Sequence, residues 1–173
     1  MCPIFTLREK SDTMKNPILL FAALATLAAS VLCASAEVKL KVFADEMFKP
    51  ALLEIVPAFT EQTGFEVQLS MGLSTFLSER IRSGGAADLF FPATEEAMKQ
   101  VMEKGLVDVA LKRHILDLPS TEPVEEGIVP EPQHISAAVL NDSPRRLQAM
   151  AFLEYLTSET ARGAFARHGF ALP

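Results

Sequence analysis

The feature that most constrains the fold of this chain is an alternation between short strand-like runs and longer helix-like runs. Residues 38–44 and 65–70 are rich in β-branched and aromatic side chains, and residues 87–91 form a short apolar run typical of a buried strand. Segments with helical spacing of apolar residues lie between them. Strands that alternate with helices predict an α/β fold, a three-layer sandwich around a mostly parallel sheet.

Local start and stop signals set the bounds of the expected helices. Pro50 is typical of a first helical turn, and Gly64 is typical of a helix end. Ser74 can cap a second helix with its hydroxyl, and Thr94 can cap a third that ends at Gly105. Three helices that each follow a strand fit the alternation.

One segment interrupts this pattern. Residues 108–133 contain four prolines with glutamates between them, a composition typical of a loop or linker. A loop of this length is unusual inside a compact domain. A strand at residues 135–140 and two helices, which begin after Ser143 and Ser158, complete the chain. The first of these helices is expected to bury Leu147, Met150, Ala151, Leu153 and Leu156.

The first 36 residues have the three parts of a secretory signal peptide. Met14-Lys15-Asn16 gives a basic start, residues 18–32 are almost wholly apolar, and Ala34-Ser35-Ala36 is a small-x-small cleavage site. The apolar run is shorter than the roughly 20 residues that a membrane span needs. We expect synthesis from Met14, cleavage after Ala36 and export of residues 37–173 as one domain. An N-terminal membrane anchor is the alternative.

Composition narrows the possible partners. Both cysteines, Cys2 and Cys33, lie in the part that we expect to be removed, so the exported domain depends on its core and not on a disulfide. The formal net charge of the chain is −6. This charge disfavours nucleic acid as a partner, because phosphate binding needs a basic face. A net negative charge does not attract anions over a distance, so any anion-binding site must depend on donors close to the ligand.

Two segments are candidates for such a site. In α/β folds, ligands bind beyond the carboxyl ends of the strands, where helix N-termini present their N–H groups. Residues 45–48 (Asp-Glu-Met-Phe) follow the first expected strand, and residues 71–75 (Met-Gly-Leu-Ser-Thr) follow the second. A glycine and two hydroxyls at a helix start suit an oxyanion. The alternative is that Ser74 only caps its helix.

Other chemical groupings are weak. His114, His134 and His168 lie far apart in the sequence and show no metal-ligand spacing, so we expect no zinc site. Asp45 with Glu46 and Asp88 could form an acid/base pair or a hard-cation site. We expect instead that Asp45 and Glu46 are solvated loop residues and that Asp88 starts a strand. There is no nucleophile elbow, phosphate loop or Cys/His pair, so we expect no catalytic residues, no cofactor and no enzymatic activity.

A group of apolar residues occupies the same two loops. Met47, Phe48, Met71 and Leu73 would form an exposed apolar patch if they were accessible together. The remaining phenylalanines fall on apolar faces and are expected in the core. The two loops could therefore bind either an anion or the surface of another protein.

Several short segments share their order and spacing with one known family. They comprise residues 40–44, 50–64, 70–77, 85–91 and 103–106, and at the other end residues 151–156, 158–161 and 165–170. Together they resemble the periplasmic molybdate-binding proteins of ABC transporters, over nearly all of the expected exported chain. No single segment is decisive, but the combination is specific.

This resemblance implies a type II periplasmic solute-binding fold, with molybdate or a related tetrahedral oxyanion as ligand and a membrane permease as partner. Two departures qualify it. The family's second lobe is missing and would be inserted at residues 108–133, and Met47 stands where the family carries a ligand-binding serine. The oxyanion site implied is therefore Ser74, Thr75, Gly72 and Met47.

Two functions from different classes follow. The first is a periplasmic oxyanion receptor of an ABC transporter. The second is a one-lobed periplasmic protein that has lost its ligand and binds another protein, or a second copy of itself, through the apolar loops. Asp45 and Glu46 weaken the first function if they face the site, because a carboxylate about 5 Å from a single negative charge costs on the order of 3 kcal/mol at an effective dielectric constant near 20.

Overall fold

The structure is a computed structural model that describes residues 39–118 and 132–173. The expected signal peptide and residues 119–131 lie outside the described residues, so the predictions for them stay predictions. Within the described ranges, no helix combines the length and the apolar character needed to cross a bilayer.

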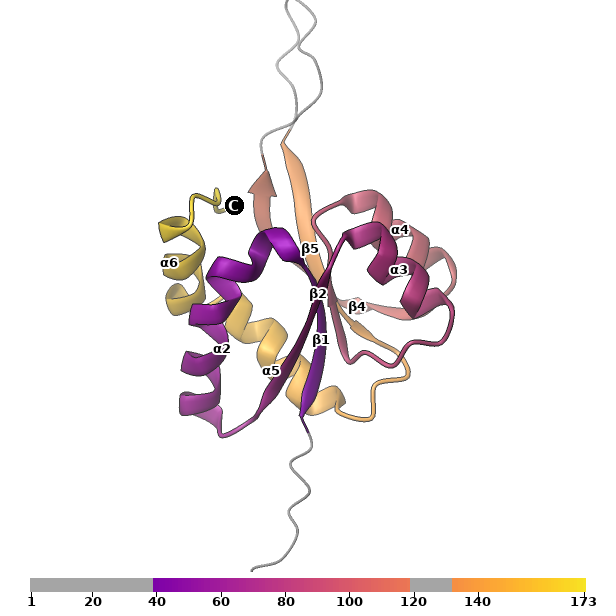
Figure 1. Ribbon diagram of the computed structural model, residues 1–173, viewed down its shortest axis with the longest axis horizontal. Coiled ribbons are helices and arrows are strands. Elements are labelled where there is room, and N and C mark those ends of the chain that lie inside the picture. Colours follow the sequence, from indigo (N-terminus) through magenta and orange to yellow (C-terminus); the bar gives the residue numbers. More distant parts are fainter. Residues whose placement is uncertain (1–38, 119–131) are drawn as a thin grey trace, which may run out of the picture. The chain divides into compact units, whose positions relative to one another are not determined.

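A five-stranded sheet runs through the middle of the molecule (Figure 1). The central strand β1 pairs in parallel with β2 and β3, and β5 pairs antiparallel with both β3 and β4. Four of the five strands therefore point the same way, which confirms the mostly parallel sheet. In spatial order the strands are β2 (Val67–Gly72), β1 (Leu40–Asp45), β3 (Leu89–Phe91), β5 (Gln133–Leu140) and β4 (Val107–Leu118).

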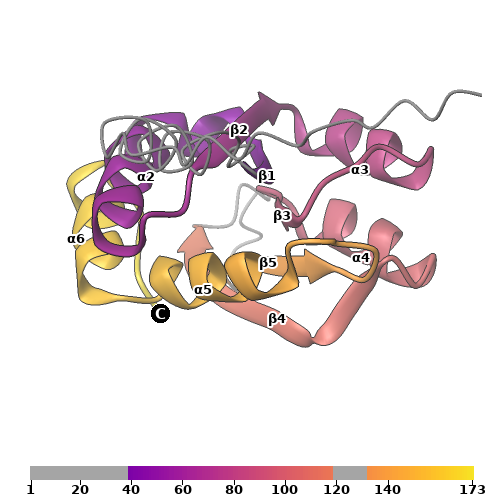
Figure 2. The ribbon, with the colours of Figure 1, turned by 90° about the horizontal axis from the view of Figure 1, so that it is seen from below.

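Helices cover both faces of this sheet, which confirms the three-layer sandwich (Figures 1 and 2). A short 3-10 helix, η2 (Glu46–Phe48), leads from β1 into the first α-helix. One face carries α2 (Lys49–Thr63), α5 (Arg146–Leu156) and α6 (Glu159–Arg167), and the other carries α3 (Ser74–Arg82) and α4 (Glu95–Glu103).

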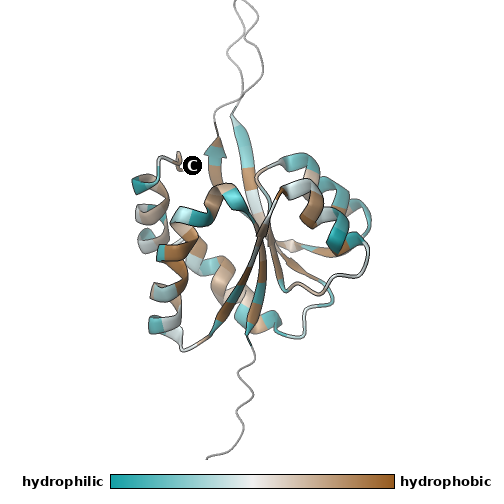
Figure 3. Cartoon of the chain, viewed as in Figure 1, coloured by the Kyte–Doolittle hydropathy of each residue, from teal (hydrophilic) through white to brown (hydrophobic). Residues whose placement is uncertain are grey.

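Two hydrophobic clusters fill the space between the layers. Leu40, Val42 and Ala44 of β1 belong to the larger cluster under α2, α5 and α6, whereas Phe43 belongs to the smaller one under α3 and α4. This division follows from the alternation of side chains along a strand. Figure 3 shows the resulting apolar strands between helices that are hydrophilic in their outer parts. Because β1 is buried on both faces, the loop at its end is held in a fixed position.

The local helix signals are borne out in part. Helix α2 ends at Gly64, whose φ of 74° is in the left-handed region that favours glycine. The Thr94 side chain accepts a hydrogen bond from the N–H of Ala97 at the start of α4, as a helix cap does. Each of these signals depends only on residues close together in the chain, so it can be recognised in the sequence.

The expected buried face of α5 is wrong in part. Leu147 is 78 % exposed and Met150 is 39 % exposed. Phe152 is completely buried and packs edge-on against Phe59 of α2. Both faces of this helix carry apolar residues, and the one with the larger aromatic side chains turns inward. The buried residues are Ala149, Phe152, Leu153, Tyr155 and Leu156.

The interpretation of residues 108–133 as a link is also wrong for its first part. Residues 108–118 belong to β4, a strand of 12 residues that pairs antiparallel with β5. Two irregularities in the register disturb the alternation along β4, and only Val107, Ile115 and Leu116 are buried in it. The sequence pattern of a strand is therefore blurred there.

Phe48 is part of the core and not of an exposed patch. Its side chain is fully buried and stacks on Phe91 with ring centroids 4.2 Å apart. By contrast, Phe76 of α3 is 65 % exposed, although we expected it in the core. Its aromatic ring therefore contributes little to stability.

These two phenylalanines provide a matched test. We expect Phe48→Ala to lower the free energy of unfolding by about 3–5 kcal/mol, because it removes a buried ring and leaves a cavity. Phe76→Ala should change it by less than about 0.5 kcal/mol. Urea denaturation followed by circular dichroism measures both. Equal losses in the two variants would contradict the placement of Phe48.

The ion pair between α2 and α6 predicts a dependence of stability on pH. The pKa of Glu54 is lowered, chiefly by its hydrogen bond from Arg167, with His168 adding a weaker contact at 3.5 Å. A lowered folded-state pKa stabilises the fold above the ordinary glutamate range, and that contribution is lost as the pH falls through the folded pKa.

We therefore expect Glu54→Gln to reduce the melting temperature by a few degrees at most near pH 7. The difference should shrink as the pH falls through the lowered folded-state pKa of Glu54 and vanish below it, where the carboxyl group is protonated in both states. Glu61→Gln, an exposed change on the same helix, is the control. A deficit that persists unchanged at low pH would show that the ion pair is not its cause.

Candidate functional site

The candidate site lies at the carboxyl end of three neighbouring parallel strands. The segments that follow β1, β2 and β3 meet there, and they begin η2, α3 and the turn before α4. In the register of the sheet, Asp45 at the end of β1 lies opposite Gly72 at the end of β2. This is the position at which ligands bind in folds of this type.

The Asp45 carboxylate is at the centre of this site and is only 7 % exposed. One oxygen, Oδ1, accepts a hydrogen bond from the backbone N–H of Met47 at 3.0 Å. The other, Oδ2, accepts from the backbone N–H of Ser74 at 2.8 Å and from the Ser74 hydroxyl at 2.5 Å. Asp45 therefore faces the site, while the neighbouring Glu46 is exposed.

The Ser74 hydroxyl bonds to residues outside its own helix and does not cap it. It is the first residue of α3, and the preceding Leu73 makes no side-chain cap. The Ser74 hydroxyl donates to Asp45 and accepts a hydrogen bond from the backbone N–H of Ala93 at 2.8 Å. The interpretation of Ser74 as a cap alone is therefore wrong, because its hydroxyl connects the ends of β1 and β3.

This arrangement surrounds a negatively charged group with hydrogen-bond donors. Three donors point at one carboxylate, and one of them is the first N–H of α3, where the helix dipole is positive. Hydrogen bonds to a charged group contribute about 1.5–3 kcal/mol each. The side chain of Asp45 thus supplies, from within the chain, the negative charge that such a site attracts.

The other predicted site residues lie around this centre in different ways. Gly72 ends β2 beside Asp45, and a Cβ there would make only ordinary contacts of 3.6 Å with Leu77. Met47 contributes its backbone N–H while its side chain is 41 % exposed. The Thr75 side chain is exposed at the edge of the site.

The expected apolar patch forms only in part. Met47 and Leu73 are exposed, but Phe48 is buried and Met71 is half-buried against the larger core cluster. Phe76 is exposed on the first turn of α3, a position that the sequence pattern did not reveal.

The two aspartates do not form an acid pair. Asp88 accepts a hydrogen bond from the N–H of Lys41, near the start of β1, so it lies at the opposite end of that strand from Asp45. Asp88 is 1 % exposed and is held by Ser143 and Arg145 as well. Its role is to fix the turn before α5, and an acid/base site with Asp45 is excluded.

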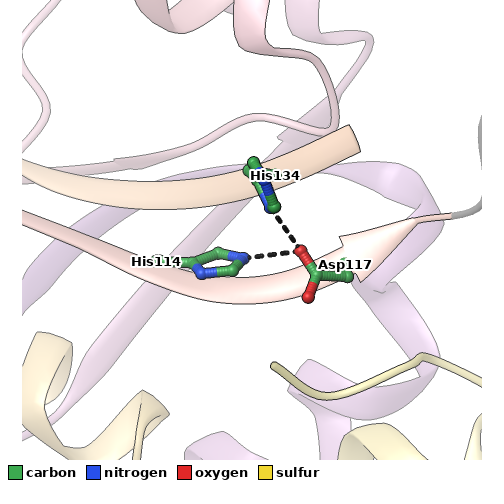
Figure 4. A group of neighbouring side chains, drawn as sticks. All are labelled: His114, Asp117 and His134. Atoms are coloured by element: carbon green, nitrogen blue, oxygen red, sulfur yellow. Dashed lines mark hydrogen bonds and ion pairs between the residues drawn. The ribbon is translucent and has the colours of Figure 1, made fainter. Parts of the chain in front are cut away.

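Two histidines come together although we expected none to do so. His114 and His134 both contact the Asp117 carboxylate, at 2.8 Å and 2.6 Å (Figure 4). These contacts, chiefly the hydrogen bond from His134, lower the pKa of Asp117. His168 lies elsewhere, beside Glu54. The expectation of separate histidines was wrong because residues 108–118 form a strand that pairs with the segment containing His134.

A single α/β lobe with hydrogen-bond donors gathered at the ends of its parallel strands has the architecture of a solute-binding lobe, and similarity to known proteins agrees. The family model of bacterial extracellular solute-binding proteins matches residues 40–121 and, in a second segment, residues 109–171. The chain therefore belongs to this family. Because it is a family of binding proteins, the expectation that the chain is not an enzyme is confirmed.

Individual proteins similar to this chain include molybdate-binding proteins. The molybdate-binding protein ModA of Escherichia coli is 31 % identical over 80 residues, which are 46 % of this chain and 31 % of the relative. The chain thus matches about a third of that relative's length. Among solved structures, the periplasmic molybdate-binding protein of Azotobacter vinelandii superposes with a TM-score of 0.67 at 13 % identity, covering 78 % of this chain and 100 % of the other.

A substrate-binding domain assigned to a molybdenum ABC transporter of Clostridium difficile superposes with a TM-score of 0.69 at 14 % identity, covering 78 % of this chain and 99 % of the other. At such low identity, these superpositions establish the fold. They confirm the expected single lobe of a periplasmic-binding-protein-like fold.

The hydrogen bonds of Ser74 predict a measurable contribution to stability. Ser74→Ala leaves the N–H of Ala93 without its partner and removes one donor from Asp45, so we expect a loss of about 1–3 kcal/mol in the free energy of unfolding. Thr75→Ala, an exposed change on the next residue, should cost less than about 0.5 kcal/mol. Urea denaturation compares the two, and an equal cost would contradict the network.

Proposed function

We propose that this protein is the periplasmic solute-binding component of an ABC transporter, with molybdate or a related tetrahedral oxyanion as its ligand. The observation that carries the proposal is the convergence of the Ser74 N–H, the Ser74 hydroxyl and the Met47 N–H on one negatively charged group. Tetrahedral oxyanions need such neutral donors. Family membership and the molybdate-binding relative support this choice of ligand.

The remaining parts of the proposal follow from the same class of protein. A binding component of this kind acts outside the inner membrane, delivers its ligand to a membrane permease and needs no cofactor. Export by the N-terminal 36 residues fits this location. Thr75 and Gly72 lie beside the donors, and the oxyanion would contact them at the edge of the site.

The Asp45 carboxylate determines how the oxyanion can bind. It occupies the donors that the ligand needs, so the two negative groups compete for the same hydrogen bonds. Binding requires the Asp45 side chain to rotate out of the site. If it remained about 5 Å from a single negative charge, the repulsion would be on the order of 3 kcal/mol at an effective dielectric constant near 20.

Replacement of Asp45 therefore tests the proposal directly. We expect Asp45→Ala to raise the affinity for molybdate by roughly two decades, the equivalent of about 3 kcal/mol, because it frees the donors and removes the charge. Isothermal titration calorimetry of the wild-type chain and the variant, with sulfate as a second anion, measures this. Ser74→Ala in the Asp45→Ala background should abolish binding.

Glu46→Ala is the matched control, since it removes the same charge from an exposed neighbouring residue without freeing the donors. It should change the affinity far less than Asp45→Ala does. If neither the wild type nor Asp45→Ala binds either anion at millimolar concentration, the oxyanion proposal fails. The protein-interaction function, through the exposed Met47 and Leu73, would then be the one to pursue.

A further inference from the structure

A second group of polar side chains lies away from the oxyanion site, on the paired strands β4 and β5. It consists of His114, Asp117 and His134. The Nε2 atom of His114 and the Nδ1 atom of His134 approach the same Asp117 oxygen, Oδ1, at 2.8 Å and 2.6 Å. Figure 4 shows both rings directed at this carboxylate from opposite strands.

The register of the two strands explains why these residues share one face. Asp117 pairs directly with His134, and His114 pairs with Ser136, two residues further along β5. Residues two apart on a strand point to the same side. An irregularity between His114 and Leu116 inserts the extra residue that brings His114 and Asp117 onto that side as well. The grouping is thus built into the backbone.

The donor set is one that binds transition metals. Two imidazole nitrogens and one carboxylate oxygen lie within 4.8 Å of one another. Zinc takes such ligands at about 2.0–2.2 Å in a tetrahedral arrangement, which places ligand atoms about 3.3 Å apart. The two contacts to Asp117 need to lengthen by about 0.5 and 0.7 Å, and all three side chains are partly exposed.

We propose that His114, Asp117 and His134 form a binding site for a divalent transition-metal ion of the zinc type. Imidazole nitrogens favour such ions over calcium or magnesium, which prefer oxygen ligands. The three side chains leave a fourth coordination position for water. The His134 side chain is 59 % exposed, so an ion can enter directly from solvent.

Metal binding requires a change of tautomer in the two imidazole rings. The Nε2 atom of His114 contacts two acceptors, the Asp117 carboxylate and the carbonyl oxygen of Leu116 at 3.0 Å, so this nitrogen carries the proton when no metal is bound. When zinc binds, the proton on each coordinating nitrogen moves to the other nitrogen of the same ring through solvent. The freed lone pairs then bind the metal.

The surroundings do not oppose a cation. The hollow beside the two histidines is also lined by Lys112 and Glu95, whose opposite charges offset each other. A bound ion would connect β4 to β5 through Asp117 and His134, close to the point where the described part of β4 ends. The site would therefore add a metal cross-link to a strand pair that backbone hydrogen bonds and the contact between His134 and Asp117 already connect.

The test is titration of the untagged, full-length protein with zinc by isothermal titration calorimetry. We expect one ion per chain, bound with a Kd of about 10 μM or tighter, and a melting temperature that rises with zinc. His114→Ala, Asp117→Asn and His134→Ala should each weaken binding by at least about tenfold. Calcium should produce no heat and no shift in melting temperature.

His168→Ala is the matched control, because His168 also contacts a carboxylate, that of Glu54, but belongs to no group of three possible ligands among the described residues. It should leave zinc binding unchanged. Melting curves recorded without zinc establish that each variant is folded, and His134→Ala, which changes the most exposed of the three side chains, is the least disruptive. The proposal is overturned if the wild type shows no binding at about 100 μM zinc. It is equally overturned if zinc binding survives in all three ligand variants or is lost in His168→Ala.

Discussion

The arrangement at the carboxyl end of the sheet depends on the hydrogen bonds between Asp45 and Ser74. Asp45 ends the central strand, Ser74 begins α3, and the same Ser74 hydroxyl accepts from Ala93 after β3. One short chain of hydrogen bonds thus connects the ends of three neighbouring strands. Without it, the buried N–H groups of Ser74 and Ala93 would lie at the edge of the core without their partners. Each such unpaired buried donor costs about 1–3 kcal/mol.

The elements that could be predicted from the sequence are those with local causes. A proline in the first turn and a glycine at the end bound α2, and the Thr94 hydroxyl begins α4. The strand-like composition of residues 38–44 likewise predicted β1. The signals for β4 fail because this strand is stabilised by β5, which follows only after residues 119–131. Pairing across such a separation leaves no local pattern, and the bulges in β4 remove the alternation that remains.

The candidate site, like the fold, could be predicted from the sequence only in part. Its location followed from a general property of α/β folds, and Ser74, Gly72 and the Met47 loop do lie together at the strand ends. The direction of the Asp45 side chain could not be predicted, since a strand end allows it to face either solvent or the neighbouring helix. The Asp45 side chain faces the helix because the Ser74 N–H lies within hydrogen-bond distance of it. The position of that N–H depends on how α3 packs against the sheet. The meeting of His114 with His134 likewise depends on one extra residue in β4.

The two sites also lie at the same end of the sheet. β5 runs antiparallel to both β3 and β4, so β4 points the same way as β1, and Asp117 and Asp45 both lie near the carboxyl ends of their strands. At this end, each aspartate gathers the donors around it. Asp45 accepts from backbone and hydroxyl groups, whereas Asp117 contacts imidazoles, whose nitrogens can also serve as metal ligands.

The internal carboxylate has a quantitative consequence for any oxyanion receptor built on this lobe. The apparent affinity equals the intrinsic affinity multiplied by the fraction of molecules in which Asp45 has left the site. Leaving it exchanges three protein hydrogen bonds for bonds to water, and the loss of even two of them, at about 1.5 kcal/mol each, makes the open form roughly a hundredfold rarer than the closed one. An oxyanion must therefore gain more from the Ser74 and Met47 donors than the carboxylate does. A dianion is suited to this competition, because it interacts about twice as strongly with the same dipoles as a single negative charge.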